Sequence, residues 1–318
     1  MKVLITGGAG MIAYSLIPLL LSGLIFGDEM IDLNLLDIDF AKNRLEAVKM
    51  AIEDSNFPKL NSLIATTKIE VAFKNIDVAI FLGGFPRKQG MERKDLLLKN
   101  FEIFKSNGIA LEIYAKKTVR VLVVANPANT NCLICDHYSP SIPSKNFTCL
   151  SYLDQERLTG LVSRKLNIKP KNISNLIIWG NHSSSLVPDT NNLLVNTSIV
   201  LPNSEKCVLD NDEINLVKNR GSSVIKKRGL SSAMSAANAI MKHMKVWFNG
   251  SNDKIVSFGI KTNNNYNLKN NLFVSLPVTT KNFNFEIVDN LNISTIIKEI
   301  KQSVEELENE YNMIKDKL

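Results

Sequence analysis

Two short blocks in the middle of the chain supply an acid/base side chain, a carboxylate and a guanidinium. Asp154 and Arg157 stand three residues apart in SYLDQERL, and His182 follows in WGNHSSS. An imidazole can take up a hydroxyl proton and return it, and a neighbouring carboxylate can orient the ring. A guanidinium can hold a carboxylate through two parallel hydrogen bonds. Hydride transfer from carbon 2 of a hydroxy acid requires these three groups, so this region predicts a catalytic centre of that kind.

The residues around this centre resemble those of malate dehydrogenases of the cytosolic type, within the lactate/malate dehydrogenase superfamily. The resemblance extends almost from end to end, and its other blocks are GGAGMIAYSL, FPRKQGMERKDLL, NPANTNC and RGLSSAMSAANAI. It implies that His182 is the acid/base, that Asp154 fixes its tautomer, and that Arg157 holds the carboxylate beside the reacting carbon. The implied reaction is reversible hydride transfer between (S)-malate and NAD to give oxaloacetate and NADH.

A dicarboxylate substrate needs a second cation, and the polar segment PRKQGMER offers Arg87 and Arg93 on what the sequence predicts to be a mobile loop. The resemblance implies that Arg87 meets the distal carboxylate and that Arg93 polarises the reacting carbonyl. It also implies that Asn126 donates to the substrate oxygen, and that Gly221 and Ser232 border the substrate pocket. The sequence SSAMS at Ser232 is equally typical of a helix start.

The N-terminal block predicts a dinucleotide site. Gly7, Gly10 and Ala13 are small where the chain must turn, approach a pyrophosphate and pack a helix on a strand. Asp37 ends the second apolar run, where its carboxylate would accept hydrogen bonds from ribose hydroxyls and repel a 2′-phosphate, which favours NAD over NADP. The other residues expected to contact the cofactor are Met11, Ile12, Gly83, Gly84 and Asn126. Met11 stands where this family usually has Gln, and Pro18 falls inside the first predicted helix.

Apolar runs without polar alternation predict strands that are covered on both faces, at residues 3–6, 33–37, 77–84 and 120–126. A glycine turn and an apolar helix from Ile12 to Gly27 follow the first run. This order predicts an α/β protein with a doubly wound parallel sheet, the Rossmann NAD domain, over residues 1–149. A mixed α+β substrate domain is expected over 150–318, and an apolar stripe at three- and four-residue steps predicts a helix at its end.

Composition limits the other possibilities. The formal net charge is +7, but the lysines are scattered with few aromatic residues among them, so we expect no nucleic-acid partner. Cys132-x-x-Cys135-x-His137 lacks the second half of a zinc site, so no metal is expected, and four cysteines indicate a reducing compartment. The longest apolar stretch is too short for a membrane span. A cytoplasmic location is expected, and the resemblance implies a homodimer.

Three alternatives remain open at this point. A lactate dehydrogenase of the same fold would carry an uncharged residue at position 87. A nucleotide-sugar epimerase or short-chain relative shares the opening VLITGGAGMI but needs a Tyr-x-x-x-Lys near mid-chain, and the sequence offers only Tyr311 to Lys315 in the final helix. A non-catalytic dinucleotide-binding or RNA-binding protein would lack one of the catalytic residues, and none is missing.

Overall fold

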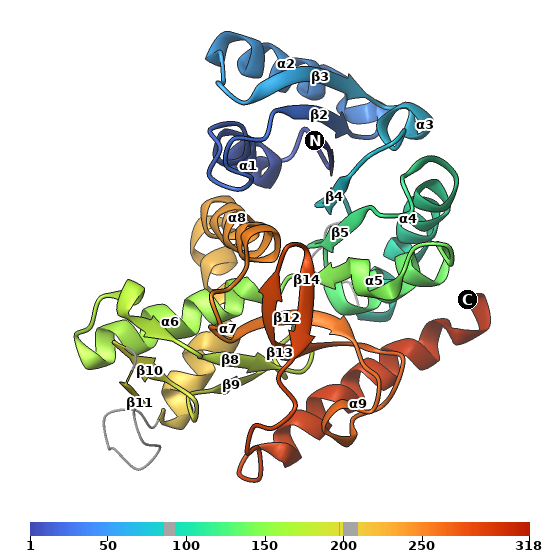
Figure 1. Ribbon diagram of the computed structural model, residues 1–318. Helices are drawn as coiled ribbons and strands as arrows, with labels where there is room; N and C mark the ends of the chain where they lie inside the picture. The colour runs from blue at the N-terminus through green and yellow to red at the C-terminus, as the bar shows by residue number, and fades with distance from the viewer. Residues whose placement is uncertain (86–92, 197, 200–208) are drawn as a thin grey trace. The chain divides into compact units, whose positions relative to one another are not determined.

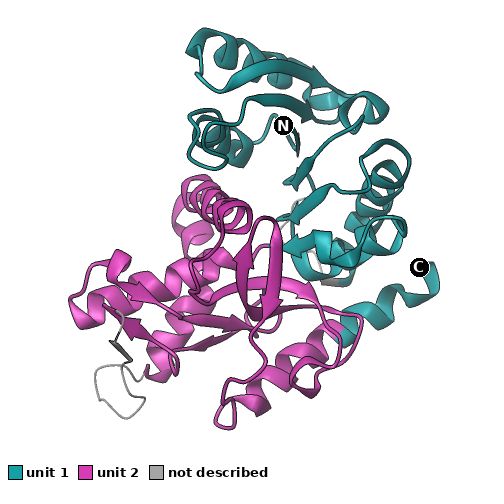
Figure 2. Cartoon of the chain, viewed as in Figure 1, with its two compact units in different colours: residues 1–149, 308–318 teal, residues 150–307 magenta. Residues whose placement is uncertain are grey.

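The computed structural model describes residues 1–85, 93–196, 198–199 and 209–318, and it divides the chain into two compact units (Figure 2). Unit 1 comprises residues 1–149 and 308–318, and unit 2 comprises residues 150–307. The sequence assigns 150–318 to one domain, whereas the contacts of the folded chain group its last residues with unit 1.

Unit 1 is built on six parallel strands in the order β3-β2-β1-β4-β5-β6, as the chain alternates between strands and helices (Figure 1). The strands are β1 (Lys2–Thr6), β2 (Ile31–Leu36), β3 (Leu60–Thr66), β4 (Val78–Phe81), β5 (Arg120–Val123) and β6 (Phe147–Cys149). The helices are α1 (Met11–Leu21), α2 (Lys42–Ser55), α3 (Ile69–Ala72), α4 (Arg93–Tyr114) and α5 (Ala128–His137). The strand order reverses between β1 and β4, where open parallel sheets bind their ligands, and the predicted doubly wound fold is confirmed.

Apolar side chains fill both faces of the central strands. Val3, Leu4 and Ile5 of β1 are fully buried, and every residue of β4 is buried. The sequence did not predict β3 and β6. All seven β3 side chains are partly or fully exposed at the edge of the sheet, and β6 has only three residues, so neither segment shows the long apolar run of a central strand.

The first helix is shorter than predicted. It ends at Leu21, while the apolar stretch continues through turns to Gly27. Pro18 lacks a backbone N–H and so removes one hydrogen bond from the last turns of the helix. The hydroxyl of Ser22 donates to the Pro18 carbonyl, and Gly23 adopts a φ of +84°, which ends the helix.

Unit 2 combines helices with small antiparallel sheets. Its helices are α6 (Tyr152–Leu166), α7 (Asn211–Arg228), α8 (Ala233–Asn249) and the part of α9 (Ile297–Ile314) up to Leu307. Its strands are β7 (Ile173–Ser174), β8 (Ile177–Trp179), β9 (Val187–Asp189), β10 (Leu194–Val195), β11 (Ser198–Ile199), β12 (Val256–Lys261), β13 (Phe273–Lys281) and β14 (Asn284–Ile287). Leu158 of α6, Ile178 of β8 and Val217 of α7 pack in one core, which fixes the two segments that carry the predicted catalytic residues.

The C-terminal helix confirms most of the predicted apolar stripe, because Ile300, Val304, Leu307 and Ile314 are buried, whereas Tyr311 of the same stripe is 37% exposed. Within the described ranges, none of the helices combines the length and apolar composition needed to cross a membrane.

Candidate active site

Asp154 joins the predicted acid/base to the predicted substrate cation. Its Oδ2 lies 2.5 Å from Nδ1 of His182, and its Oδ1 accepts a hydrogen bond from Nη1 of Arg157 at 2.6 Å. Asp154 and Arg157 are three residues apart on α6, so they share one face of the helix. His182 follows β8 after a glycine turn. One carboxylate therefore orients both groups, as the sequence predicted for the His–Asp pair.

The three side chains of this cluster differ in their exposure to solvent. The Asp154 side chain is 1% exposed, whereas those of His182 and Arg157 are 16% and 17% exposed, enough for each to reach a ligand. Burial raises the pKa of the Asp154 carboxyl, but the charge and hydrogen bond of His182, followed by those of Arg157, outweigh it and leave this pKa below its ordinary value. Asp154 is therefore an anion that can stabilise an imidazolium.

The predicted pocket residues of unit 2 differ in what surrounds them. Gly221 lies on α7 against Arg157, since a Cβ added to it would be 3.4 Å from Nη2 of the guanidinium. Ser232 is the N-cap of α8, where its hydroxyl accepts hydrogen bonds from the Ser235 N–H and from the Ser235 hydroxyl, which donates at 2.7 Å. Gly221 thus lies beside the guanidinium that is predicted to hold the substrate carboxylate, whereas Ser232 has the alternative role of capping the start of a helix.

The other two histidines have different environments. His243 is fully buried and stacks on Phe258 at 3.7 Å between ring centroids, and burial lowers its pKa to about 3. His137 is exposed, and its Nε2 lies 2.9 Å from the carbonyl oxygen of Leu318. The contact of His182 Nδ1 with the buried Asp154 carboxylate makes His182 the candidate acid/base.

In unit 1 the glycine turn brings backbone close to backbone. Gly7 has a φ of +67°, and a Cβ added to it would lie 2.8 Å from the Gly83 nitrogen. A Cβ on Gly8 would lie 2.9 Å from Cβ of Leu35. Gly10 closes the turn by donating to the Gly7 carbonyl at 2.9 Å. Only glycine fits where the ends of β1 and β4 meet, which matches the predicted dinucleotide turn.

Helix α1 begins directly after this turn. Gly10 is its N-cap and has no side chain to cap it, so the backbone N–H groups of the first turn, beginning with Met11 and Ile12, can donate to an anion. Met11 is half exposed, and its side chain is apolar. These main-chain donors could hold a pyrophosphate, and they do not include the side chain at position 11.

Asp37 lies just beyond β2, as predicted, and fixes the glycine turn. Its Oδ2 accepts from the Ala9 N–H at 2.9 Å, and its Oδ1 accepts from the Ile38 N–H at 2.8 Å. A carboxylate has about four lone-pair positions, so capacity remains for ribose hydroxyls. Asp37 therefore both holds the turn and presents a negative charge at the predicted ribose position.

A buried asparagine that the sequence did not single out holds the segment after β4. Asn100 Oδ1 accepts from the Phe85 N–H at 2.8 Å, and its Nδ2 donates to the Phe85 carbonyl at 3.2 Å. Gly84 leaves room for it, since a Cβ there would lie 2.9 Å from Asn100 Oδ1. The only sequence signal was a polar residue among the apolar positions of α4. Asn126 follows β5 at the same edge of the sheet and is exposed.

Both parts of the chain match the same family of proteins. Residues 1–148 match the lactate/malate dehydrogenase NAD binding domain, and residues 151–318 match the lactate/malate dehydrogenase alpha/beta C-terminal domain. The chain belongs to the lactate/malate dehydrogenase family. The expected Rossmann domain and its NAD cofactor follow from this membership.

Both malate dehydrogenases and lactate dehydrogenases occur among the relatives of the chain. A cytoplasmic malate dehydrogenase of Medicago sativa is 43% identical over 98% of this chain and 96% of its own. The crystal structure of a Naegleria fowleri malate dehydrogenase superposes with a TM-score of 0.93 at 35% identity, over 100% of this chain and 98% of its own. A Trichomonas vaginalis lactate dehydrogenase in complex with NADH and oxamate gives 0.91 at 34% identity, over 99% and 98%. The overall fold therefore does not separate malate from lactate dehydrogenases.

The residues expected to separate them lie in a part of this dehydrogenase that is not described. Arg87 falls within 86–92, outside the described residues, and Arg93 is the first residue of α4, with its side chain outside the description as well. Their roles stay predictions.

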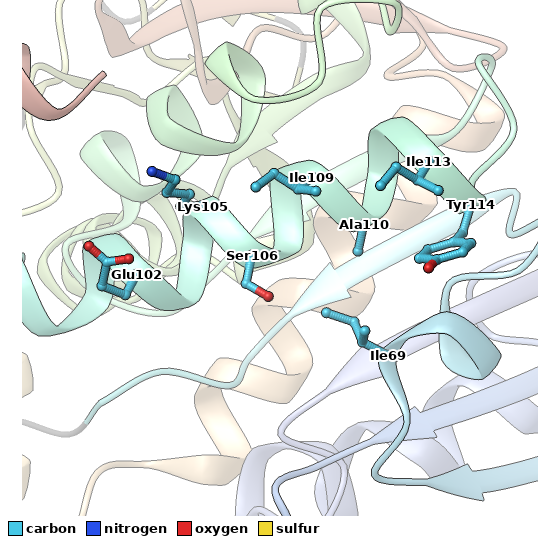
Figure 3. A pocket seen from close by; sticks show the side chains of 8 residues that line it. All are labelled: Ile69, Glu102, Lys105, Ser106, Ile109, Ala110, Ile113 and Tyr114. Carbon is cyan, nitrogen blue, oxygen red and sulfur yellow. The ribbon is translucent and has the colours of Figure 1, made fainter.

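Other features of this family member do not include the predicted site residues. No group of three or more metal-ligating side chains occurs among the described residues, and Cys132, Cys135 and Cys149 are buried thiols. Burial raises the pKa values of Cys135 and Cys149. A largely apolar groove of about 320 Å³ lies between α3 and α4 of unit 1 and contains none of the predicted site residues (Figure 3). It is lined by Ile69, Glu102, Lys105, Ser106, Ile109, Ala110, Ile113 and Tyr114.

Proposed function

We propose that this dehydrogenase catalyses reversible hydride transfer between (S)-malate and NAD, giving oxaloacetate and NADH. The observation that carries the proposal is the pair of contacts made by Asp154, which link His182 to Arg157 through one buried carboxylate. The near full-length similarity to proteins named malate dehydrogenase supports this choice within the family.

His182 is the acid/base in this proposal. Asp154 accepts a hydrogen bond from Nδ1, which leaves Nε2 to take the malate hydroxyl proton and to return it to oxaloacetate. The imidazolium that forms lies beside an anion, and this contact lowers the cost of charging the ring. Arg157 holds the carboxylate next to the reacting carbon, with its own orientation fixed by the second oxygen of Asp154.

The cofactor residues act mainly through their backbone. We assign the pyrophosphate to the N–H groups at the start of α1, beside Gly7 and Gly10, and the ribose hydroxyls to Asp37. Gly83, Gly84 and Asn126 border the path of the dinucleotide, and Asn126 also donates to the substrate oxygen. When bound, NAD supplies the hydride acceptor. Because Asp37 would repel a 2′-phosphate, kcat/KM with NADH should exceed that with NADPH, and equal values would refute its role.

The remaining substrate contacts complete the proposal. Arg87 pairs with the distal carboxylate, Arg93 polarises the carbonyl, and Gly221 and Ser232 border the pocket. The methyl group of pyruvate cannot form an ion pair with a guanidinium, so Arg87 favours a dicarboxylate over pyruvate.

The test is oxidation of NADH by the purified protein with oxaloacetate, pyruvate and 2-oxoglutarate in parallel. We expect oxaloacetate to give the highest kcat/KM. A preference for pyruvate would identify a lactate dehydrogenase, and no turnover with any 2-oxo acid would refute the dehydrogenase assignment.

We further propose a cytoplasmic homodimer without a nucleic-acid or membrane partner. The cytoplasmic names of the relatives support the location. Membership of the lactate/malate dehydrogenase family supports the dimer. Light scattering with size-exclusion chromatography should give twice the chain mass of 35.5 kDa, and a monomer would refute the dimer.

A further inference from the structure

Helix α9 binds the loop that carries His182 through a hydroxyl and a carboxylate. Ser303 is fully buried, and Glu306 lies one turn further along, partly buried. The Asn181 backbone N–H donates to Ser303 Oγ at 2.9 Å. Glu306 Oε2 accepts from Asn181 Nδ2 at 3.0 Å and from the Ser183 hydroxyl at 2.5 Å. The residue before His182 and the residue after it are therefore both tied to α9.

The same helix contacts the loop at both of its ends. Gly180 has a φ of +89°, and a Cβ added to it would lie 2.2 Å from Ser303 Oγ. The Ser185 hydroxyl donates to Glu306 Oε2, and its oxygen lies 3.0 Å from Ser303 Oγ. Any side chain at position 180 would force the loop and helix apart. These contacts specify the loop position closely.

The ring of His182 is held by a different element. Its Nδ1 meets Asp154 of α6, while the side chains of its two neighbours meet α9. The backbone at position 182 is thus fixed from α9 and the ring from α6. A shift of the loop away from α9 would move the backbone while Asp154 stays in place, and a hydrogen bond weakens steeply with distance and angle.

We propose that Glu306, assisted by Ser303, is a positioning residue that keeps His182 in its catalytic place. This inference rests on the acid/base role proposed for His182. Glu306 does not contact the substrate in this proposal, and it acts through Asn181 and Ser183.

One carboxylate oxygen of Glu306 accepts hydrogen bonds from three side chains of the loop, those of Asn181, Ser183 and Ser185. Hydrogen bonds to an ionised acceptor are about twice as strong as neutral ones. Glutamine offers a neutral oxygen of the same shape, so Glu306→Gln should weaken the contacts, whereas Glu306→Ala removes them. A displacement of about 1 Å at a catalytic group can cost about 10²-fold in rate.

Kinetics of oxaloacetate reduction test the inference, with Glu305→Ala as the control because Glu305 is an exposed carboxylate next to Glu306 on the same helix. We expect Glu306→Ala to lower kcat by about 10²-fold and Glu306→Gln by about 10-fold. The NADH dissociation constant, measured by fluorescence titration, should stay unchanged. Glu305→Ala should match the unmodified protein in both measurements.

A spectroscopic measurement separates positioning from a general loss of structure. The chain has three histidines, so the proton NMR signal of the His182 Nδ1–H can be assigned by its absence in His182→Asn. We expect this signal to weaken or broaden in Glu306→Ala and to stay unchanged in Glu305→Ala. If Glu306→Ala does not fold, Ser183→Ala with Ser185→Ala removes two donors from the loop side and should give the same two changes.

Two results overturn the inference: a kcat like that of the Glu305→Ala control, or a lowered kcat with an unaltered His182 signal. Failure of the proposed function looks different, since the unmodified protein would then not reduce oxaloacetate or His182→Asn would remain active. The NMR comparison needs no turnover, so it still decides whether α9 positions His182.

Discussion

The cofactor edge of unit 1 consists mainly of backbone contacts, whereas the catalytic cluster of unit 2 consists of contacts between side chains. In unit 1 the close contacts join backbone to backbone, as where Gly7 meets Gly83, and the groups proposed to bind the cofactor's phosphates are the N–H groups of α1. In unit 2 the contacts join charged side chains around the buried Asp154. A backbone site constrains where glycine must stand and leaves neighbouring side chains free, whereas a side-chain site constrains each residue by its chemistry.

This difference explains how the cofactor edge can contain unusual residues. Met11 replaces the Gln usual in the family, and Pro18 interrupts α1, yet the glycine turn and the start of the helix keep their hydrogen bonds. No comparable replacement occurs at Asp154, Arg157 or His182.

The largest effect should come from the side-chain site. His182→Asn should lower kcat by about 10⁴-fold, because proton transfer by a positioned base contributes up to this factor. NADH binding should stay within error of the unmodified protein by fluorescence titration, since the imidazole handles the proton. A variant that retains turnover would place the acid/base elsewhere.

The next largest effect should come from the cation expected to recognise the distal carboxylate. Arg87→Gln should lower kcat/KM on oxaloacetate by about 10³-fold, because a buried charge without its partner costs about 4 kcal/mol. It should also improve pyruvate relative to oxaloacetate. Arg93→Gln is the matched variant, and it should depress turnover on every 2-oxo acid because all of them need a polarised carbonyl. An unchanged oxaloacetate-to-pyruvate ratio in Arg87→Gln would contradict this division of roles.

The backbone site should respond to a single methyl group. Gly7→Ala should weaken NADH binding by about tenfold, because its Cβ would meet the Gly83 backbone at 2.8 Å and push apart the two segments that flank the proposed cofactor site. Gly27→Ala is the control, since Gly27 also has a positive φ of +62° but has nothing within 4 Å of the added Cβ. Equal NADH affinity in the two variants would mean that the close approach to Gly83 is unimportant.

The smallest effect should come from replacing Met11 with Gln, the residue that is usual in the family at this position of the cofactor site. Met11→Gln should change the NADH dissociation constant by less than about threefold, because exposed substitutions usually cost no more than 0.5 kcal/mol. A much larger gain in affinity would show that a side chain, and not the main chain alone, binds the cofactor at this position.

The sequence predicted the central strands and the Asp154–Arg157 pair because each leaves a local signal, whereas the pairing of Asp154 with His182 was implied by the family resemblance. Val3 to Ile5 form a fully apolar run, and Asp154 and Arg157 have the spacing of one helix face. Residues that act across long separations left no such signal. Asn100 holds Phe85, and Glu306 holds the residues beside His182 from 121 to 125 positions away. Both are polar residues on helices that also carry other polar residues, and only the fold reveals their partners.

A double-mutant cycle between Asp154 and His182 tests most directly the claim that one buried carboxylate serves both groups. Asp154→Asn alone should lower kcat by about 10² to 10⁴-fold, because an amide can hold the ring but cannot stabilise its cation. In the His182→Asn background, measured by single turnover of oxaloacetate with NADH, the same change should have no further effect on the rate of the chemical step. It should still raise KM, because Arg157 loses its partner. Multiplicative losses in rate would show that Asp154 does not act through His182 and would contradict this account of the site.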